Sequence, residues 1–277
     1  MGRRLVGLGT IGVLLFLYIP IGIIFLYSFN ADKAQTWPIT SWTTSWYGIA
    51  VANTAIRDAL VLSLETAVLA TALALFLGSL ASFAVHRFRF FGRETISFLL
   101  ILPLALPGIV TGMALNATFN TIGVPFSIFT IVVGHATFCV VVVYNNVVAR
   151  LRRTSGSFEE ASADLGATTW QTFRFVTFPS MKTALAAGAL LAFALSFDEI
   201  IVTTFTIGAG EETLPIWIFR NLFRPKELPI VDAVAVIVIL ISIIPVYLAH
   251  RLSSEEGGVT GGKGGGAADI AEVTAAP

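Results

Sequence analysis

The chain alternates long apolar runs with short polar segments. Six runs are predominantly apolar, and they lie at Leu5–Phe29, Ala59–Val85, Thr95–Phe119, Phe126–Ala149, Ala184–Ile207 and Val231–Leu252. Because a helix rises 1.5 Å per residue, each run can cross the roughly 30 Å hydrocarbon core of a bilayer. Barrel strands would instead be about 10 residues long with alternating polarity. The pattern predicts an all-α integral membrane protein with six transmembrane helices over residues 1–252.

The charges indicate how these helices are oriented. The chain has no net charge, yet 12 of its 17 Lys and Arg residues lie at the N-terminus, in the second and fourth loops and in the tail. Cytoplasmic loops of membrane proteins carry the excess of Lys and Arg. We therefore expect a multi-pass membrane protein with both termini and the loop over 150–183 in the cytoplasm. A cleaved signal peptide is disfavoured, because the first run exceeds the usual apolar core of such a peptide.

The tail over 253–277 is rich in Gly and Ala and has no hydrophobic period, so it is predicted to be a disordered cytosolic segment. Gly257, Gly262 and Lys263 match a phosphate-loop pattern, but Gly264 stands where that loop needs Ser or Thr. No nucleotide site is predicted in this chain. The single cysteine, Cys139, lies inside an apolar run and is expected to serve packing.

Two features of the apolar part suggest specialised positions. The third run contains Pro103 and Pro107, and each proline removes a backbone donor and is expected to kink or gate the helix. Broken membrane helices are tolerated where they face protein or a water-filled path. The first outer loop holds four aromatic residues, which fit an interfacial belt better than a docking surface for an extracytoplasmic partner; they are Trp37, Trp42, Trp46 and Tyr47.

A polar island from Arg150 to Lys182 separates the fourth and fifth runs. Ser157 followed by Glu160 predicts a helix that starts with a capping box. One face of that helix carries small and large side chains at helical spacing, namely Phe158, Ala161, Ser162 and Leu165. Gly166 is suited to end the helix in the left-handed conformation.

A second short helix is predicted directly after this turn. Thr168 and Gln171 form another capping box, and the residues that follow are aromatic. Pro179 is expected to stop this helix before the fifth span begins. Exposed aromatic side chains here would leave an apolar patch in the cytosol, which a partner protein could cover.

The island resembles the EAA motif of permease subunits of ABC importers, written E-A-x-x-x-x-G, nine residues, then [IV]-x-[LF]-P. The positions of the motif are filled by Glu160, Ala161, Gly166, Val176, Phe178 and Pro179. Ser162 and Phe178 stand where the family usually has Ala and Leu. Segments Leu102–Val110 and Ser196–Gly208 resemble the permeases for spermidine and putrescine (PotC-type).

The resemblance implies a type I importer permease with the MetI-like fold. It implies a cytosolic ABC ATPase dimer that binds ATP and Mg, a second permease subunit and an extracytoplasmic substrate-binding protein. The chain itself would be a transport subunit without catalytic residues or a metal site. The island helix would be the coupling helix seated in the ATPase, and the residues implied are Phe158, Glu160, Ala161, Ser162, Leu165, Gly166 and Pro179.

Acidic residues within the apolar runs suggest the solute. Glu65, Asp198 and Glu199 lie in runs that contain no Lys or Arg, and buried charge in a membrane usually marks function. An acidic path suits a cationic solute, and the resemblance to the PotC-type permeases implies that this solute is a polyamine. Adjacent residues of a helix point about 100° apart, so only one of Asp198 and Glu199 would face the path. His135 is expected to be a hydrogen-bonded packing residue rather than a ligand.

Three alternatives remain open at this point. A membrane-embedded hydrolase with an aspartate site would need a second acid on another helix at similar depth, and Glu65 is the only candidate. Gly108 stands where the polyamine permeases often have an acid, so another amine-bearing solute or a shorter cation is possible. An ion-coupled secondary transporter could also use Asp198 and Glu199 as a relay.

Overall fold

The computed structural model describes residues 2–33, 35–154, 156–224 and 228–257. These residues form helices and contain no strand, apart from an isolated antiparallel bridge between Asn30 and Trp42. The helices are α1 (Gly2–Tyr27), α2 (Ser45–Ala52), α3 (Thr54–Arg87), α4 (Arg93–Ala105), α5 (Gly108–Ile122), α6 (Ile128–Arg153), α7 (Ser157–Asp164), α8 (Thr169–Thr172), the π-helical η1 (Phe173–Thr177), α9 (Phe178–Phe197), α10 (Ile201–Thr206), α11 (Leu214–Leu222) and α12 (Leu228–Gly257).

The predicted all-α membrane class is confirmed, whereas the predicted count of six spans is not. Four helical stretches among the described residues are long and apolar enough to cross a membrane, at Leu5–Tyr27, Thr54–Arg87, Ile128–Arg153 and Thr169–Phe197. The pair α4 and α5 passes the same test together but bends by 105°. The last apolar run lies in α12, where Leu228–Ile243 is apolar but shorter than the four spans.

The bend between α4 and α5 lies at Pro107. Leu106 has extended dihedral angles, φ −80° and ψ 143°, as expected for a residue that precedes proline. Pro107 then occupies the N-cap position of α5, where its missing N–H leaves no helical hydrogen bond unmade. Pro103 lies inside α4, which continues past it to Ala105.

Small residues hold α3, α6 and α9 close together. A Cβ placed on Gly78 of α3 would lie 2.9 Å from the Cβ of Val143 in α6. A Cβ on Gly188 of α9 would lie 3.3 Å from the Cα of the same valine. Membrane helices lack a hydrophobic driving force between them, so close backbone approach at small residues supplies the packing. α6 is thus the central helix of the bundle.

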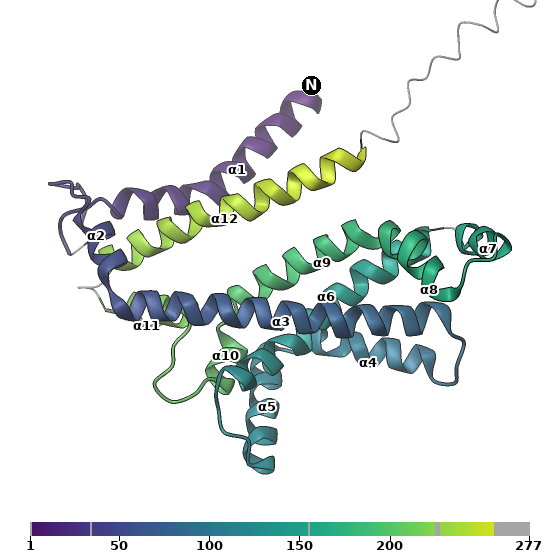
Figure 1. Ribbon diagram of the computed structural model, residues 1–277. Helices are drawn as coiled ribbons and strands as arrows, with labels where there is room; N and C mark the ends of the chain where they lie inside the picture. Colours follow the sequence, from purple (N-terminus) through teal and green to yellow (C-terminus); the bar gives the residue numbers. More distant parts are fainter. Residues whose placement is uncertain (1, 34, 155, 225–227, 258–277) are drawn as a thin grey trace, which may run out of the picture.

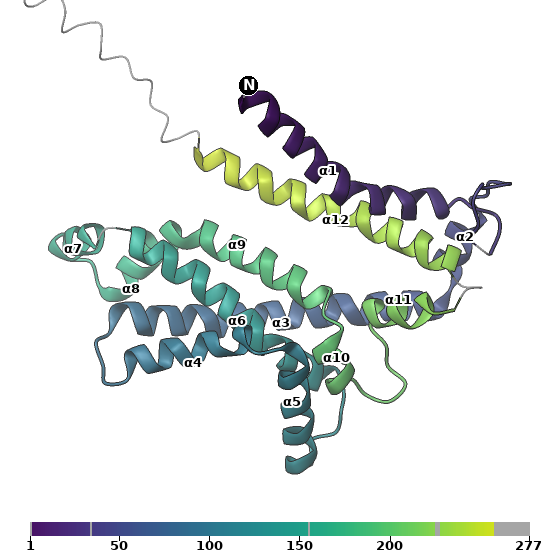
Figure 2. The same ribbon diagram turned by 180° about the vertical axis from the view of Figure 1, so that it is seen from behind.

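Figure 1 shows how the other helices surround this bundle, and Figure 2 gives the same arrangement from behind. α1 and α12 lie side by side along one flank and run in opposite directions. α2 and α11 lie at one end of α3, while α7 and α8 lie at its other end. α5 projects sideways and carries α10 against it.

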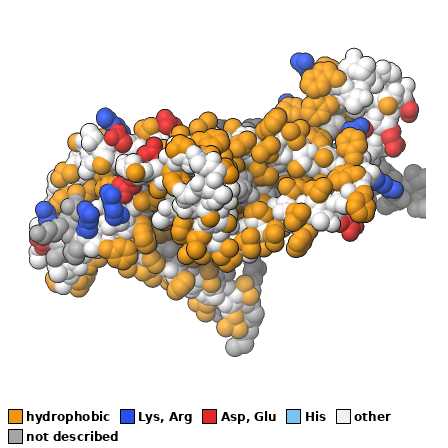
Figure 3. Space-filling view, turned by 90° about the horizontal axis from the view of Figure 1, so that it is seen from below, with side chains coloured by type: hydrophobic (Ala, Val, Ile, Leu, Met, Phe, Trp, Pro, Cys, Tyr) orange, Lys and Arg blue, Asp and Glu red, His pale blue; other side chains and the backbone are white. Residues whose placement is uncertain are grey.

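The surface agrees with a membrane-embedded chain. In the view of Figure 3, hydrophobic side chains cover the middle of the molecule and charged side chains gather towards its two ends. α12 continues through Gly257, into the stretch after Ser253 for which disorder is predicted. The remainder of that tail, which includes Gly262 and Lys263 of the phosphate-loop match, lies outside the described residues.

Candidate functional site

The island forms two short helices joined by a glycine turn, but the first begins one residue away from its predicted position. Gly156, not Ser157, occupies the N-cap of α7, with helical angles of φ −61° and ψ −19°. Its carbonyl accepts the backbone N–H groups of Glu159 and Glu160 at 3.0 and 3.1 Å. The predicted capping by Ser157 is therefore wrong, because the helical geometry already includes Gly156 and Ser157 is the first residue of α7.

The turn after α7 is a Schellman motif. Gly166 has φ +81°, in the left-handed region that glycine adopts without strain. The N–H of Gly166 donates to the carbonyl of Ala163 at 2.8 Å, and the N–H of Ala167 donates to that of Ser162 at 3.1 Å. These are the two hydrogen bonds that define the motif. They fix the direction in which the chain leaves α7.

The second helix begins as its sequence predicts but does not end there. Thr168 and Gln171 form the expected capping box at the start of α8. The helix then passes through the π-helical η1 into α9, with Pro179 in the first turn of α9. The prediction that Pro179 stops the helix is wrong. The wider π turn before Pro179 gives room for a ring that would otherwise clash with the preceding turn.

Two acidic residues of α7 have different environments. Glu159 forms an ion pair with Arg87 at the end of α3, with 2.9 Å between Oε2 and the guanidinium nitrogen. Its Oε1 accepts the hydroxyl hydrogen of Thr177 in η1 at 2.6 Å. Glu160, the acid of the motif, is exposed. α7 is thereby joined to both α3 and η1 while Glu160 points to the surface.

The island also presents large apolar side chains that are exposed. Phe158 is 64% exposed, Leu165 89% and Trp170 65%. Ala161 is exposed beside them, whereas Ser162 is half-buried and hydrogen-bonds Thr172 at 3.0 Å between the hydroxyl oxygens. We define these three large side chains with Glu160 and Ala161 as the α7 surface.

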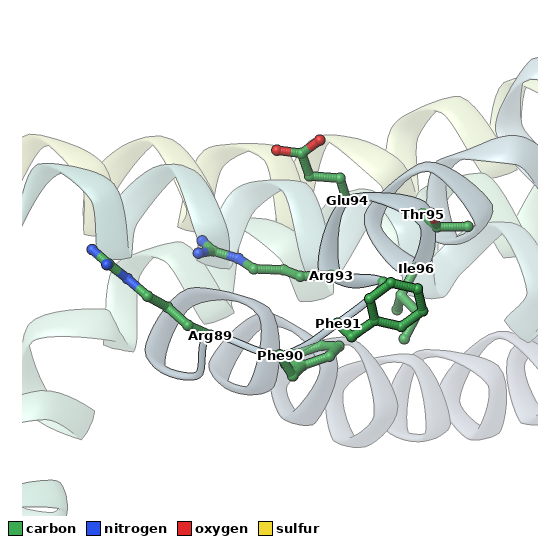
Figure 4. Close-up of a pocket in the computed structure, with 8 residues that line it drawn as sticks. Arg89, Phe90, Phe91, Arg93, Glu94, Thr95 and Ile96 are labelled. Carbon is green, nitrogen blue, oxygen red and sulfur yellow. The ribbon is translucent and has the colours of Figure 1, made fainter.

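The loop between α3 and α4 lies at the same end of the molecule. Residues 89–96 line an open cavity of about 700 Å³. Figure 4 shows Arg89 and Arg93 extending to one side of this loop, with Phe90 and Phe91 on its other side. Arg87, immediately before the loop, is the residue that pairs with Glu159. This end of the molecule therefore combines basic, aromatic and acidic groups next to α7.

The acids of the fifth run lie in a break between two helices. α9 ends at Phe197 with Asp198 as its C-cap, and α10 begins at Ile201. The prediction that Asp198 and Glu199 belong to one continuous helix is therefore wrong. The Asp198 side chain is exposed, while Glu199 is half-buried and its Oε1 accepts the N–H of Val202 at 2.8 Å. Glu199 thus caps α10, and Asp198 remains at the surface of the break.

The short helix α10 has partners at both ends. A helix end at membrane depth leaves backbone groups that only protein or enclosed water can satisfy. Besides the Glu199 cap, the Phe205 carbonyl accepts Asn116 Nδ2 of α5 at 2.6 Å, and the Thr206 carbonyl accepts the hydroxyl of Thr130 in α6 at 2.7 Å. These bonds hold the helix break in a defined geometry.

The other candidate acids lie elsewhere. Glu65 is exposed on α3, and no hydrogen bond or ion pair within the described ranges connects it to the α9–α10 break. Asp232, in the first turns of α12, belongs to the acids of the apolar runs but was missing from the predicted set. It is buried, and Gln35 Nε2 of the first outer loop donates to its Oδ2. An inspection of every acid in the sixth run would have found it.

The aromatic residues of that outer loop divide into two pairs. Trp46 is buried and its Nε1–H donates to the carbonyl of Asn30 at 2.8 Å, and Tyr47 shares a 2.6 Å hydrogen bond with Ser28. Trp37 and Trp42 are exposed. Only the second pair is free for an interface with lipid or protein.

Comparison with known proteins identifies the class. Residues 74–255, more than half of the chain, match the family described as the inner membrane component of binding-protein-dependent transport systems. The chain belongs to this family. It is a permease subunit of an ABC importer, and thus a transport component rather than an enzyme.

Individual relatives refine this assignment. The chain is 35% identical over 252 residues to the putrescine transport system permease protein PotI of Escherichia coli (strain K12), covering 87% of this chain and 89% of that protein. It is 31% identical over 257 residues to the spermidine/putrescine transport system permease protein PotC of the same strain, covering 92% and 96%.

A solved structure shares the fold. The crystal structure of a bacterial ABC transporter involved in the import of the acidic polysaccharide alginate superposes with a TM-score of 0.67 at 20% sequence identity, over 92% of this chain and 97% of that one. This agreement supports the predicted importer-permease fold, and the low identity limits it to the fold.

Proposed function

We propose that the chain is a permease subunit of an ABC importer for a polyamine such as spermidine or putrescine. The observation that carries the proposal is the similarity to two polyamine permeases over most of the chain. The exposed carboxylate of Asp198 at the break between α9 and α10 supports it, because an acid within a transmembrane region suits a cationic solute. Glu199 and Glu65 are secondary candidates for the path.

In this proposal the α7 surface docks on a cytosolic ABC ATPase, which binds ATP and Mg. Three large exposed apolar side chains next to an exposed glutamate need a protein cover in the cytosol. The Schellman turn and the contacts of Glu159 make α7 a rigid attachment to α3 and η1. Closure of the ATPase dimer would then move α7 and switch the permease between two discrete states.

The remaining assignments follow the charge distribution and the family. Both termini and α7 lie in the cytoplasm, which agrees with α1 and α12 having their free ends directed away from the α2 end. A second permease subunit completes the membrane part, and an extracytoplasmic binding protein delivers the solute. Pro107 allows the bend at which α4 and α5 can reorient during access.

The solute is tested first on the binding protein, because that partner selects the cargo. Calorimetric titration with spermidine, putrescine and a neutral or anionic control set should give submillimolar binding for a polyamine only. Asp198→Asn in the reconstituted complex should then weaken polyamine uptake, with Asp58→Asn, an exposed acid of α3, as the matched control. Unaltered uptake by the Asp198 variant would remove Asp198 from the path.

The coupling assignment is tested by charge inversion on α7. Glu160→Lys should abolish ATP-driven uptake while the variant inserts into the membrane normally. Glu94→Lys provides the control, since Glu94 is also exposed and lies in the first turn of α4, outside α7. Full uptake by the Glu160 variant would contradict docking through the α7 surface.

A further inference from the structure

His135 of α6 is buried between both sides of the α9–α10 break. Its side chain is 1% exposed. Nδ1 lies 2.7 Å from the hydroxyl oxygen of Ser196, in the last turn of α9. Nε2 lies 2.8 Å from the hydroxyl oxygen of Thr203 in α10. One imidazole therefore bonds the helix before the break and the helix after it.

We infer the position of the ring proton from the second hydrogen bond of Thr203. Thr203 Oγ1 donates its single hydrogen to the backbone carbonyl of Glu199 at 2.7 Å. Towards His135 the same oxygen can only accept, so Nε2 carries the hydrogen. In the neutral ring Nδ1 is then an acceptor, and the Ser196 hydroxyl donates to it. The chain of bonds runs from Ser196 through His135 and Thr203 to Glu199.

The neighbouring residue brings α10 close enough for these bonds. A Cβ on Gly134 would lie 3.1 Å from Cγ1 of Val202 and 3.4 Å from Cγ2 of Thr206, so only a very small residue permits this approach. Glu199 is thus held twice, at its carbonyl by the Thr203 hydroxyl and at its carboxylate by the Val202 N–H. Asp198 lies between the two helix ends that His135 connects.

We propose that His135 is a positioning residue for the solute path: its Nε2–H, acting through Thr203, fixes the segment that presents Asp198. The inference rests on the proposed role of Asp198 for its effect on transport. We call the hydrogen bonds of His135 with Ser196 and Thr203 the clamp. The clamp does not depend on the role of Asp198, so the two can be tested separately. His135 needs no contact with the solute for this function.

Three substitutions separate this role from simple packing. A glutamine amide nitrogen can reach the position of Nε2 and donate to Thr203, whereas an asparagine amide reaches only the position of Nδ1. Leucine fills space without either bond. We expect His135→Gln to keep the clamp and His135→Asn and His135→Leu to lose it. A packing role alone would instead rank the variants by volume, with leucine tolerated.

The first readout is hydrogen exchange of α10 in the reconstituted complex, which reports the clamp without reference to transport. Exchange over residues 199–206 should accelerate about tenfold in His135→Asn and His135→Leu, as expected for the loss of one buried hydrogen bond, and far less in His135→Gln. Equal exchange in all three variants would overturn the inference.

The second readout is uptake per folded complex. The half-saturating polyamine concentration should rise at least about fivefold in His135→Asn and recover towards wild type in His135→Gln. Thr203→Ser, which keeps the hydroxyl, should resemble wild type, and Thr203→Val should resemble His135→Asn. If Asp198→Asn weakens uptake while His135→Asn changes neither exchange nor half-saturation, the positioning role is wrong and the proposed path stands. If His135→Asn accelerates exchange while Asp198→Asn leaves uptake unchanged, the clamp stands and the path is wrong.

Discussion

Replacing Gly166 with alanine should loosen the turn that orients α7 without causing a clash. A Cβ at this position would meet no atom within 4 Å, so the penalty comes from the backbone alone. At φ +81° an L-residue costs roughly 1–2 kcal/mol relative to glycine. Since 1.4 kcal/mol is a factor of ten, local opening of the turn should increase about 5- to 30-fold.

The assay is amide hydrogen exchange of Ala167, whose N–H donates to Ser162 across the turn. Gly166→Asn should show a smaller increase, because asparagine tolerates the left-handed region better than alanine. Gly48→Ala in α2, where a Cβ likewise meets nothing within 4 Å and φ is not positive, should leave Ala167 exchange unchanged. ATP-driven uptake should fall in the alanine variant while membrane insertion is retained. Unchanged Ala167 exchange in Gly166→Ala would refute the reasoning.

Two further substitutions test the supports around the site. Glu159→Gln removes the ion pair with Arg87. Because both side chains are partly exposed, the free energy of unfolding should fall by only about 0.5 kcal/mol. The difference should disappear in 1 M salt when thermal unfolding is compared at low and high salt. A loss of several kcal/mol would mean that the pair is desolvated in the assembly. Gly78→Ala places a Cβ 2.9 Å from Val143 and should destabilise the bundle by about 1–3 kcal/mol in a denaturant titration, whereas Gly22→Ala, with nothing within 4 Å, should not. Equal stability of the two variants would contradict the close α3–α6 contact.

The helical membrane class and the layout of the island could be predicted from the sequence, because both depend on local rules. Apolar runs of span length leave few alternatives to helices. The residue types alone predict the left-handed turn at Gly166 and the capping box of Thr168 and Gln171. The N-cap of α7 differed by one residue, since boundary positions depend on small dihedral differences at Gly156 that no residue type specifies.

The helix break at Asp198 could not be predicted from the sequence, because it arises from tertiary contacts. The run Ala184–Ile207 has no proline, and no glycine next to Asp198, that would mark the break there. The break is stabilised by residues distant in the sequence, including His135, Asn116 and Thr130. The helical continuity through Pro179 likewise depends on a π turn, which short-range patterns do not reveal.

The sequence predicted which acids belong to the proposed path, but not their geometry. Asp198 and Glu199 were found as acids, but their division into an exposed side chain and a helix cap required the structure. His135 was expected to be a hydrogen-bonded packing residue, and the structure confirms its burial and gives it two hydroxyl partners. The sequence could not identify these partners, because Ser196 lies 61 residues from His135 along the chain.

The most direct test of the central claim is uptake of labelled spermidine or putrescine into proteoliposomes that contain the full complex with its ATPase, second permease and binding protein. The account predicts polyamine uptake that requires both ATP and the binding protein and that an imposed proton or sodium gradient cannot replace. Uptake driven by an ion gradient without ATP, or ATP-driven uptake of another solute with polyamines excluded, would contradict it.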